Sequence, residues 1–243
     1  MTTKATTRAL ITVGAVFYSS FLIEIIAGYP LPPTRAFLSE LAARNQATSP
    51  LLRTTDMIAG LCFTIAGLLA ISPRLTPRKH LPSSPSLRHH RLSYARAYMN
   101  LAEHWREYVS IGFLIAGIAT ILDSIFPMDC AESSPSCASY IAAGAASISH
   151  HIHAVTSSFA GLGIMIIAGG AIAAWRKNHG RMAVILRWIA WGVVVTMLTQ
   201  IMALALGWPI GIVQRLQVVL TVVMFIVVAF LVAGSAHQPG QER

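Results

Sequence analysis

The chain has 243 residues, of which 55% are hydrophobic and 11% charged, with a mean hydropathy of +0.62 and a formal charge of +9. This composition excludes an ordinary soluble domain and is typical of a polytopic membrane protein. The sequence shows no nucleic-acid-binding motif, so we attribute the positive charge to membrane topology and to contacts with anionic lipids, and we expect no nucleic-acid partner.

Six apolar stretches are long enough to cross a bilayer, which takes about 20 residues. They predict an all-α bundle that forms one membrane domain over residues 1–243, because a helix satisfies its own backbone hydrogen bonds in lipid. The predicted spans are residues 9–28, 54–73, 105–126, 150–174, 183–206 and 213–234. The first span carries Glu24 and has no clear cleavage site, so we take it as a retained helix; a cleaved signal peptide is the alternative.

A short outer helix is predicted between the first two spans. Prolines at positions 30, 32 and 33 break the chain, and an amphipathic stretch follows from Thr34 to Asn45. Its pattern favours a helix lying on the membrane surface. This helix could be a surface connector, or it could fold over a cavity as a lid that brings Ser39 and Glu40 to a site.

Basic residues predict the orientation of the chain. Of the 18 Lys and Arg residues, 14 fall on the side that holds both termini, the loop 74–104 with the adjoining Arg106, and the turn 176–187. Positively charged loops face the cytoplasm. We therefore expect a multi-pass protein of the plasma (inner) membrane with both termini cytoplasmic, and a solvated cytoplasmic loop that carries no chemistry.

Polar residues gather at the extracytoplasmic ends of the six spans. A carboxylate at bilayer depth costs about 2.5–3.5 kcal/mol, so such residues usually face a bundle interior and mark function. Since neighbouring spans run in opposite directions, these ends share one layer. The layer comprises Glu24, Asp56, Asp123, His150, His151, His153, Gln200, Gln214, Arg215 and Gln217. It predicts a single site that faces the extracytoplasmic side.

The histidines of this layer suggest a metal. His150 and His153 are three residues apart and therefore share a helix face. With Asp123 they could bind zinc or another divalent ion, because a catalytic zinc takes three protein ligands and keeps one position for water. Asp56 or Glu24 could replace Asp123. A metal-free acid–base site and a structural hydrogen-bond network are the alternatives. We expect no haem, because histidines of this layer come from one helix only.

We assign further roles within the layer by residue type. The candidate catalytic residues are Asp123, His153, Asp56 and Glu40, and the candidate substrate-binding residues are Arg215, Gln200 and Ser39. Arg215 could instead neutralise a buried acid, since a guanidinium suits either role. For Asp56, pairing with Arg53 three residues earlier is the alternative.

Two cysteines lie in the short loop 127–148, which we predict to be extracytoplasmic. Cys130 and Cys137 are close in sequence, and disulfides persist in that compartment, so we expect a bond between them.

Several short motifs resemble a family of uncharacterised six-helix prokaryotic membrane proteins that is known only as a domain of unknown function. They are Tyr29-Pro30, Leu38-Ser39-Glu40-Leu41-Ala42, Asp56 with Gly60, Asp123 with Phe126-Pro127-Met128-Asp129, and His153. The resemblance extends from about Tyr18 to Leu231 and singles out Ser39, Glu40, Asp56, Asp123, Asp129 and His153. More distantly, the chain is similar to eukaryotic membrane proteins of the DRAM and GPI-lipid-remodelling type, which implies lipid chemistry.

Three function classes are open. The leading hypothesis is a lipid-acting hydrolase or acyl transferase at the outer leaflet, although no HExxH motif or nucleophile elbow supports it. A proton- or cation-coupled transporter is the second, and the lack of a convincing internal repeat counts against it. The third is a non-catalytic subunit of an envelope complex, or a homo-oligomer, in which small residues such as Gly161 and Gly169 pack against partner membrane proteins.

Overall fold

In a computed structural model of the protein, residues 3–71, 104–174 and 180–234 are described, and this part of the chain is helical without strands. It contains six helices long and apolar enough to cross a membrane. They are α1 (Thr3–Tyr18) with its continuation to Ile26, α3 (Ser49–Ile71), α5 (Trp105–Ile125), α7 (Ile148–Ala174), α8 (Arg181–Leu206) and α9 (Gly211–Gly234). The predicted six-span, all-α membrane protein is thereby confirmed. Nearly all of the predicted loop 74–104 lies outside the described residues.

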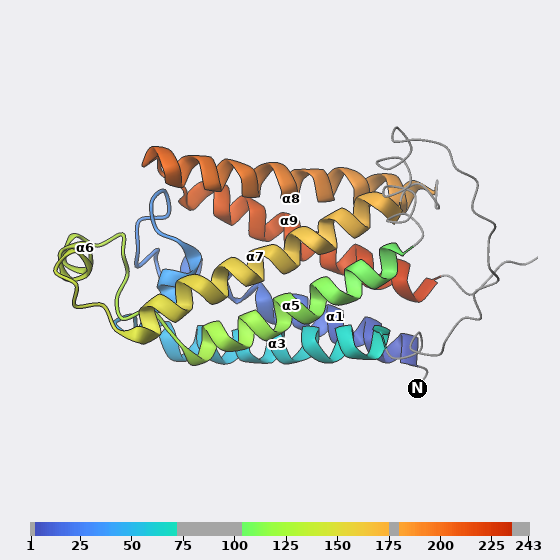
Figure 1. Cartoon of the computed structure of the whole chain (residues 1–243), viewed down its shortest axis with the longest axis horizontal. Coiled ribbons are helices and arrows are strands. Elements are labelled where there is room, and N and C mark those ends of the chain that lie inside the picture. Colours follow the sequence, from blue (N-terminus) through green and yellow to red (C-terminus); the bar gives the residue numbers. More distant parts are fainter. Residues whose placement is uncertain (1–2, 72–103, 175–179, 235–243) are drawn as a thin grey trace, which may run out of the picture.

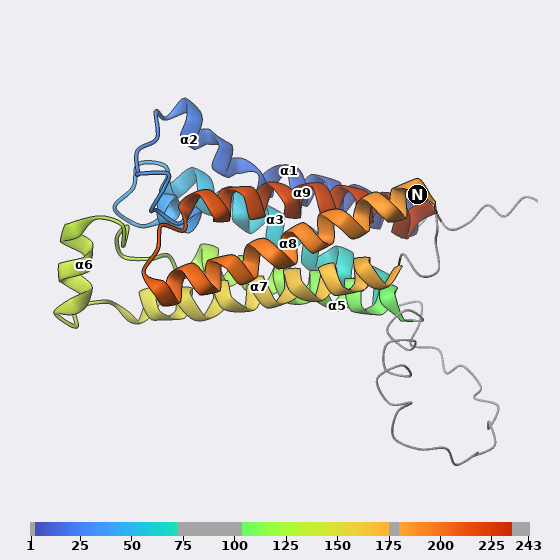
Figure 2. The same cartoon turned by 90° about the horizontal axis from the view of Figure 1, so that it is seen from above.

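The six spans form a ring in chain order, in which each packs beside the next and α9 returns to α1 (Figures 1 and 2). One end of the ring carries residues 27–48, 126–147 and 207–210, and we refer to it as the loop end. The other end carries Thr3 and Gly234 and is the terminal end (Figure 1).

Glycines set how closely the ring packs on one side. A Cβ atom on Gly117 would lie 2.5 Å from the backbone nitrogen of Thr64, and one on Gly163 would lie 2.5 Å from that of Ala116. Such contacts are possible only without side chains, and they allow helix backbones in a membrane to touch. Helices α3, α5 and α7 therefore pack backbone to backbone.

Apolar side chains fill the ring toward the terminal end. Phe63, Phe113 and Phe225 pack with ring centroids 5.0–5.6 Å apart, and Ile11 and Met224 are buried beside them. Aromatic rings at these separations attract one another beyond their burial of area. This aromatic cluster closes the ring below the layer of polar residues.

The first span differs from the single helix predicted over residues 9–28. Helix α1 ends at Tyr18, and a 3-10 turn (η1, Ser20–Leu22) and a short helix α2 (Ile23–Ile26) complete the span. Ser19 Oγ donates to the Ala15 carbonyl (2.8 Å) and Ser20 Oγ accepts from Thr55 (2.7 Å). A serine pair that bonds in this way is a common cause of a kink, and it turns α2 away from the neighbouring helices (Figure 2).

The kink brings Glu24 to Arg215 of α9. The Arg215 guanidinium donates from Nε and Nη2 to the two carboxylate oxygens (2.8 and 2.6 Å); Glu24 is buried, and the Arg215 side chain is 13% exposed. Its Nη1 donates to the carbonyls of Pro33, Ala36 and Gly211 at 2.9–3.0 Å. One guanidinium thus ties together the first span, the loop after it and the start of α9.

The outer helix predicted over Thr34–Asn45 is a single 3-10 turn, η2 (Leu38–Ala42). Its apolar side chains pack into the loop end, where Leu41 and Ala42 are buried, instead of lying along a membrane surface. The cause is Glu40, whose carboxylate accepts from the backbone N–H groups of Phe37 (2.9 Å) and Ser133 (2.8 Å). These bonds draw the segment inward.

A short helix that the sequence did not predict, α6 (Pro135–Ala142), projects from the loop end (Figure 1). Ser134 caps it by accepting from the Cys137 N–H, and Pro135 occupies its first turn, which are standard helix-start signals. The predicted disulfide is confirmed: Cys130 is bonded to Cys137, with Cα atoms 5.7 Å apart.

We expect Arg215→Met to destabilise the protein strongly, because it leaves Glu24 buried and unpaired. Removing one partner of a buried pair costs about 3–5 kcal/mol, which corresponds to at least about 6 °C in unfolding midpoint for a chain of this size. Thermal unfolding in mild detergent measures it. The matched control is Arg35→Gln, which changes an exposed arginine on the loop that Arg215 contacts. The double variant Glu24→Met/Arg215→Met should recover part of the loss; equal losses in the single and double variants would contradict the pairing.

Candidate functional site

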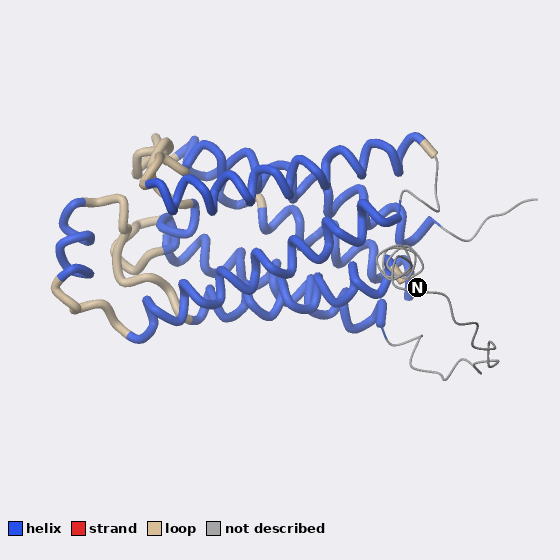
Figure 3. Tube along the Cα trace, turned by 45° about the horizontal axis from the view of Figure 1, so that its top comes forward, coloured by secondary structure: helices blue, strands red, loops and turns tan. Residues whose placement is uncertain are grey.

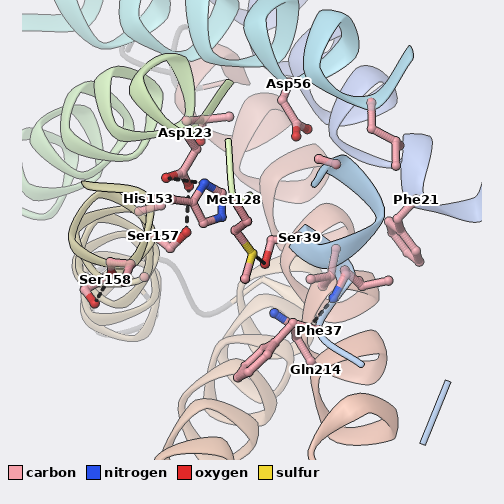
Figure 4. A pocket seen from close by; sticks show the side chains of 18 of the residues that line it. Phe21, Phe37, Ser39, Asp56, Asp123, Met128, His153, Ser157, Ser158 and Gln214 are labelled. Atoms are coloured by element: carbon pink, nitrogen blue, oxygen red, sulfur yellow. Dashed lines mark hydrogen bonds and ion pairs between the residues drawn. The ribbon is translucent and has the colours of Figure 1, made fainter. Parts of the chain in front are cut away.

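A cavity of about 510 Å³ lies inside the ring toward the loop end (Figure 4). This volume is typical of small-molecule sites, which span about 300–1,000 Å³. All six spans contribute to its walls, as do Phe37, Leu38, Ser39 and Ala42. The residues of the predicted polar layer that line it are Asp56, Asp123, His150, His153, Gln200, Gln214 and Gln217, together with Ser39. Tyr18 also lines the cavity and packs on the aromatic cluster, so it forms part of the floor.

Asp123 and His153 form a dyad between α5 and α7. The Asp123 carboxylate accepts hydrogen bonds from the hydroxyls of Ser157 (2.9 Å) and Thr156, and its Oδ1 lies 3.6 Å from His153 Nδ1. His153 Nδ1 also lies 3.1 Å from the Phe126 carbonyl oxygen. Since the carbonyl can only accept, we assign the proton of the neutral imidazole to Nδ1.

The other nitrogen of His153 is unusual. His153 is buried, and its Nε2 has no hydrogen-bond partner among the described residues. In the assigned tautomer, Nε2 carries a lone pair at the cavity wall (Figure 4). Buried polar atoms are almost always paired, and an exception calls for an explanation such as a ligand or a catalytic role. His153 is therefore a residue of the cavity wall that carries a buried, unpaired ring nitrogen.

His150 has the opposite arrangement. Its Nδ1 accepts from the Asp129 N–H (3.3 Å), so its Nε2 carries the proton and donates to Glu132 (2.9 Å). Both ring nitrogens are used within the protein. In keeping with this, the described residues contain no group of three His, Cys, Asp or Glu side chains placed to hold a metal ion. The zinc site of His150, His153 and Asp123 gains no support from this geometry and stays a prediction.

Asp56 reaches the cavity from α3 and points into it alongside Asp123 (Figure 4). It lies deeper than the sequence suggested, because α3 begins at Ser49. The pairing considered for it with Arg53 is not what the described structure shows: Arg53 Nε donates to the Ser124 carbonyl (2.9 Å). Arg53 thereby joins α3 to the end of α5.

Amides and hydroxyls form the wall opposite the dyad. Gln214 accepts from the Leu38 N–H (2.7 Å) through its carbonyl oxygen, which leaves its NH₂ group as a donor. Gln217 donates to Thr221 (2.8 Å), which leaves its carbonyl oxygen as an acceptor. Ser39 Oγ lies 4.0 Å from Met128 Sδ. This wall can hydrogen-bond a polar ligand.

Two predicted site residues do not line the cavity. Glu40 is buried and accepts from two backbone N–H groups, and Arg215 is engaged by Glu24 and three carbonyls. The structure places both in contacts that hold loops, and for Arg215 this is the neutralising role considered above. Sequence reasoning missed Thr156 and Glu132. Thr156 could have been found, because it lies three residues after His153 on the same helix face.

Asp129 fixes the start of α7. Its carboxylate accepts from the backbone N–H and the hydroxyl of Ser147, both at 2.7 Å, and Ser147 Oγ in turn accepts from the His150 N–H. Partial burial favours the neutral acid, but the bonds from Ser147, the charge of Arg44 and the nearby His150 outweigh it and lower the pKa of Asp129 below its ordinary value. The histidine-bearing turn is thus held by an ionised carboxylate.

Comparison with known proteins identifies a family. A family model described as "Protein of unknown function (DUF998)" matches residues 93–231, which is more than half of the chain, and the chain belongs to this family. The matched region contains Asp123, His153 and the disulfide. No curated protein and no solved structure matches the chain significantly.

We expect the stability supplied by Asp129 to depend on pH. Its pKa is lower in the folded than in the unfolded protein, so its contribution is fully present above the unfolded value of about 3.9 and is lost as the pH falls through the folded value. The difference in unfolding midpoint between the wild type and Asp129→Asn should therefore be largest near neutral pH and shrink below about pH 4. A difference that stays constant from pH 7 to pH 3 would show that the charge is not what matters.

Proposed function

We propose that this member of the DUF998 family is a membrane-embedded hydrolase or acyl transferase that acts on a lipid, with His153 as its general base. The observation that carries the proposal is the buried Nε2 of His153, which has no partner among the described residues and lines a cavity. A positioned base within reach of a bound water or alcohol is the central element of acid–base catalysis.

The reaction we propose is cleavage of a lipid ester. His153 Nε2 accepts a proton from water while the water oxygen attacks the carbonyl carbon. The protonated imidazole then gives this proton to the leaving alkoxide as the carbon–oxygen bond breaks, and a carboxylic acid and an alcohol result. In acyl transfer, a second alcohol takes the place of water.

Neighbouring groups have supporting roles in this proposal. The Asp123 carboxylate, 3.6 Å from His153 Nδ1, stabilises the imidazolium that forms in the first step. The NH₂ group of Gln214 can donate to the oxyanion that develops on the carbonyl oxygen. If zinc or another divalent ion takes part, the unpaired Nε2 of His153 would be one of its ligands.

The position of the cavity supports a lipid substrate. Asp56, Asp123 and His153 belong to helices long and apolar enough to span a membrane, so solutes reach them from the bilayer or its interface. The distribution of basic residues favours the outer leaflet. The disulfide in residues 130–137 agrees with an oxidising compartment at the loop end.

Transport, the second hypothesis, needs a path across the bundle. Beneath the cavity, Phe63, Phe113 and Phe225 fill the described ring with apolar rings. A polar site with an apolar floor suits chemistry on one side of the membrane better than passage through it. A role as a non-catalytic subunit does not require the free histidine nitrogen.

We expect His153→Ala to lose at least about 100-fold in hydrolysis rate, since a general base contributes roughly 10²–10⁴-fold. The measurement is release of fatty acid or fluorescent alcohol from a panel of phospholipid and N-acyl or O-acyl lipid esters by protein purified in mild detergent. His151→Ala is the matched control, because His151 is the adjacent but exposed histidine and does not line the cavity. Metal content is determined on the same samples.

Two outcomes would contradict the proposal. One is a wild-type protein that hydrolyses none of these lipids faster than the His153→Ala variant. The other is equal loss in His151→Ala and His153→Ala, which would point to a structural effect of changing this helix turn.

A further inference from the structure

Helices α7 and α8 separate toward the loop end. They lie close together at the terminal end, where Ala174 and Arg181 are near in sequence, and diverge along their length (Figure 1). The tight glycine contacts of α7 are with α5, whereas α7 meets α8 through side chains. The seam between α7 and α8 is therefore the loosest part of the ring near the cavity.

The cavity lining extends into this seam. Four of the lining residues are exposed: Glu132 in the loop after α5, Ala154 and Ser158 on α7, and Leu204 on α8. Leu204 has 65% of its surface exposed. Ala154 and Ser158 on α7 and Leu204 on α8 thus reach from the cavity to the outer surface at the place where the two helices diverge, which points to a sideways opening between α7 and α8.

The surroundings of this opening are lipid. Ala154, Ser158 and Leu204 lie within helices of 27 and 26 residues that are long and apolar enough to cross a membrane. The side chains exposed around the opening are apolar or small, among them Val155, Leu162 and Ile201. An opening with such a rim at this depth admits hydrocarbon more readily than charged solutes, which would lose hydration without gaining a partner.

The cavity is polar in one part and apolar in another. The level of Asp123 is marked by its bond to Ser157, and the polar side chains gather there and toward the loop end. Ile164 lies about two helical turns, or roughly 10 Å, below Ser157 on the same helix. Together with Met197 it gives the deeper part an apolar lining. This distribution fits an amphiphile whose polar group lies at the dyad and whose chain lies below it.

We propose that the seam between α7 and α8 is a lateral portal through which an acyl chain of a membrane lipid enters the cavity. The proposal rests on the function proposed above for the chemistry at His153, and it defines the substrate class as membrane lipids with at least one long acyl chain. The ester that reacts lies next to the polar group, near the dyad, and the chain passes through the seam on the loop-end side of the contact between Gly161 and Met197.

Gly161 lies at the edge of the portal, where α7 and α8 come into contact. It lines the cavity, and a Cβ atom placed on it would lie 3.1 Å from Met197 Cε, the end of a flexible side chain on α8. A large side chain there would fill the seam and displace Met197. Gly169, on the same helix, would place a Cβ atom in open space and provides a matched control.

The experiment is photocrosslinking in liposomes of phosphatidylethanolamine and phosphatidylglycerol, in which part of the phosphatidylglycerol carries a diazirine on one acyl chain. Mass spectrometry locates the adducts on the full chain. Lipid in the surrounding bilayer can label exposed residues, but only a chain inside the cavity can label Phe21, Ile164 and Val218, which line it and are at most 8% exposed. We expect adducts on these three residues in the wild type.

Gly161→Trp should abolish the internal adducts, and Gly169→Trp should retain them. Ala154→Trp, at the exposed rim of the portal, is a second blocking variant that requires no repacking of buried side chains. Unfolding midpoints of all three confirm that they fold. Absence of internal adducts in the wild type, or their persistence in both blocking variants, would overturn the portal.

Different experimental results would contradict the portal and the proposed hydrolysis. His153→Ala should keep the internal adducts and lose hydrolysis. Internal adducts without hydrolysis by the wild type would support the portal and contradict the proposed enzymatic function. Hydrolysis of a short-chain ester without internal adducts would support the enzymatic function and contradict the portal.

Discussion

A buried charge in a membrane bundle must be paired, and the Arg215–Glu24 ion pair is the constraint on which the loop end depends. The guanidinium satisfies both carboxylate oxygens and three backbone carbonyls from two separate segments. Carbonyls of irregular backbone at this depth would otherwise have no donor. The kink at Ser19–Ser20 brings Glu24 within reach, and the loop from Pro33 to Ala36 is held over the bundle as a consequence. A cavity can then lie between this loop and the aromatic cluster.

The two sides of the ring differ in how helices meet, and the cavity follows from that difference. Between α3, α5 and α7, glycines let backbones touch, which fixes the dyad residues Asp123 and His153 at one level. Between α7 and α8 the contact is through side chains, and the helices diverge (Figure 1) toward the end of the bundle where the loops gather (Figure 3). Rigid packing on one side positions the catalytic candidates, and looser packing on the other provides access. Well-supported sites are commonly built in this way, on elements that do not move.

The sequence predicted well how far along its helix each polar residue lies, and predicted poorly which residues it contacts. Depth follows from counting residues along apolar spans, so it correctly grouped Asp56, Asp123 and His153 in one cavity. Rotation about each helix and the partner across the bundle do not follow from counting. Glu40 and Arg215 are at the same level as the cavity residues, yet they point into loop contacts. Helix α6 was missed because it lies in a 22-residue loop without the apolar periodicity of a span, although Ser134-Pro135 signals its start.

The two histidines show why residue type and spacing do not determine chemistry. His150 and His153 share a helix face, as predicted, but their hydrogen bonds are reversed: a backbone N–H donates to Nδ1 of His150, and a carbonyl faces Nδ1 of His153. The first arrangement, completed by Glu132, consumes both nitrogens, and the second leaves Nε2 of His153 as a buried base. These partners come from residues 126–132, the segment tied down by Glu40 and the disulfide. The loop between α5 and α7 thus determines which histidine keeps an unpaired ring nitrogen, and it does so partly through the backbone atoms of Phe126 and Asp129, whose positions do not follow from the pattern of side chains.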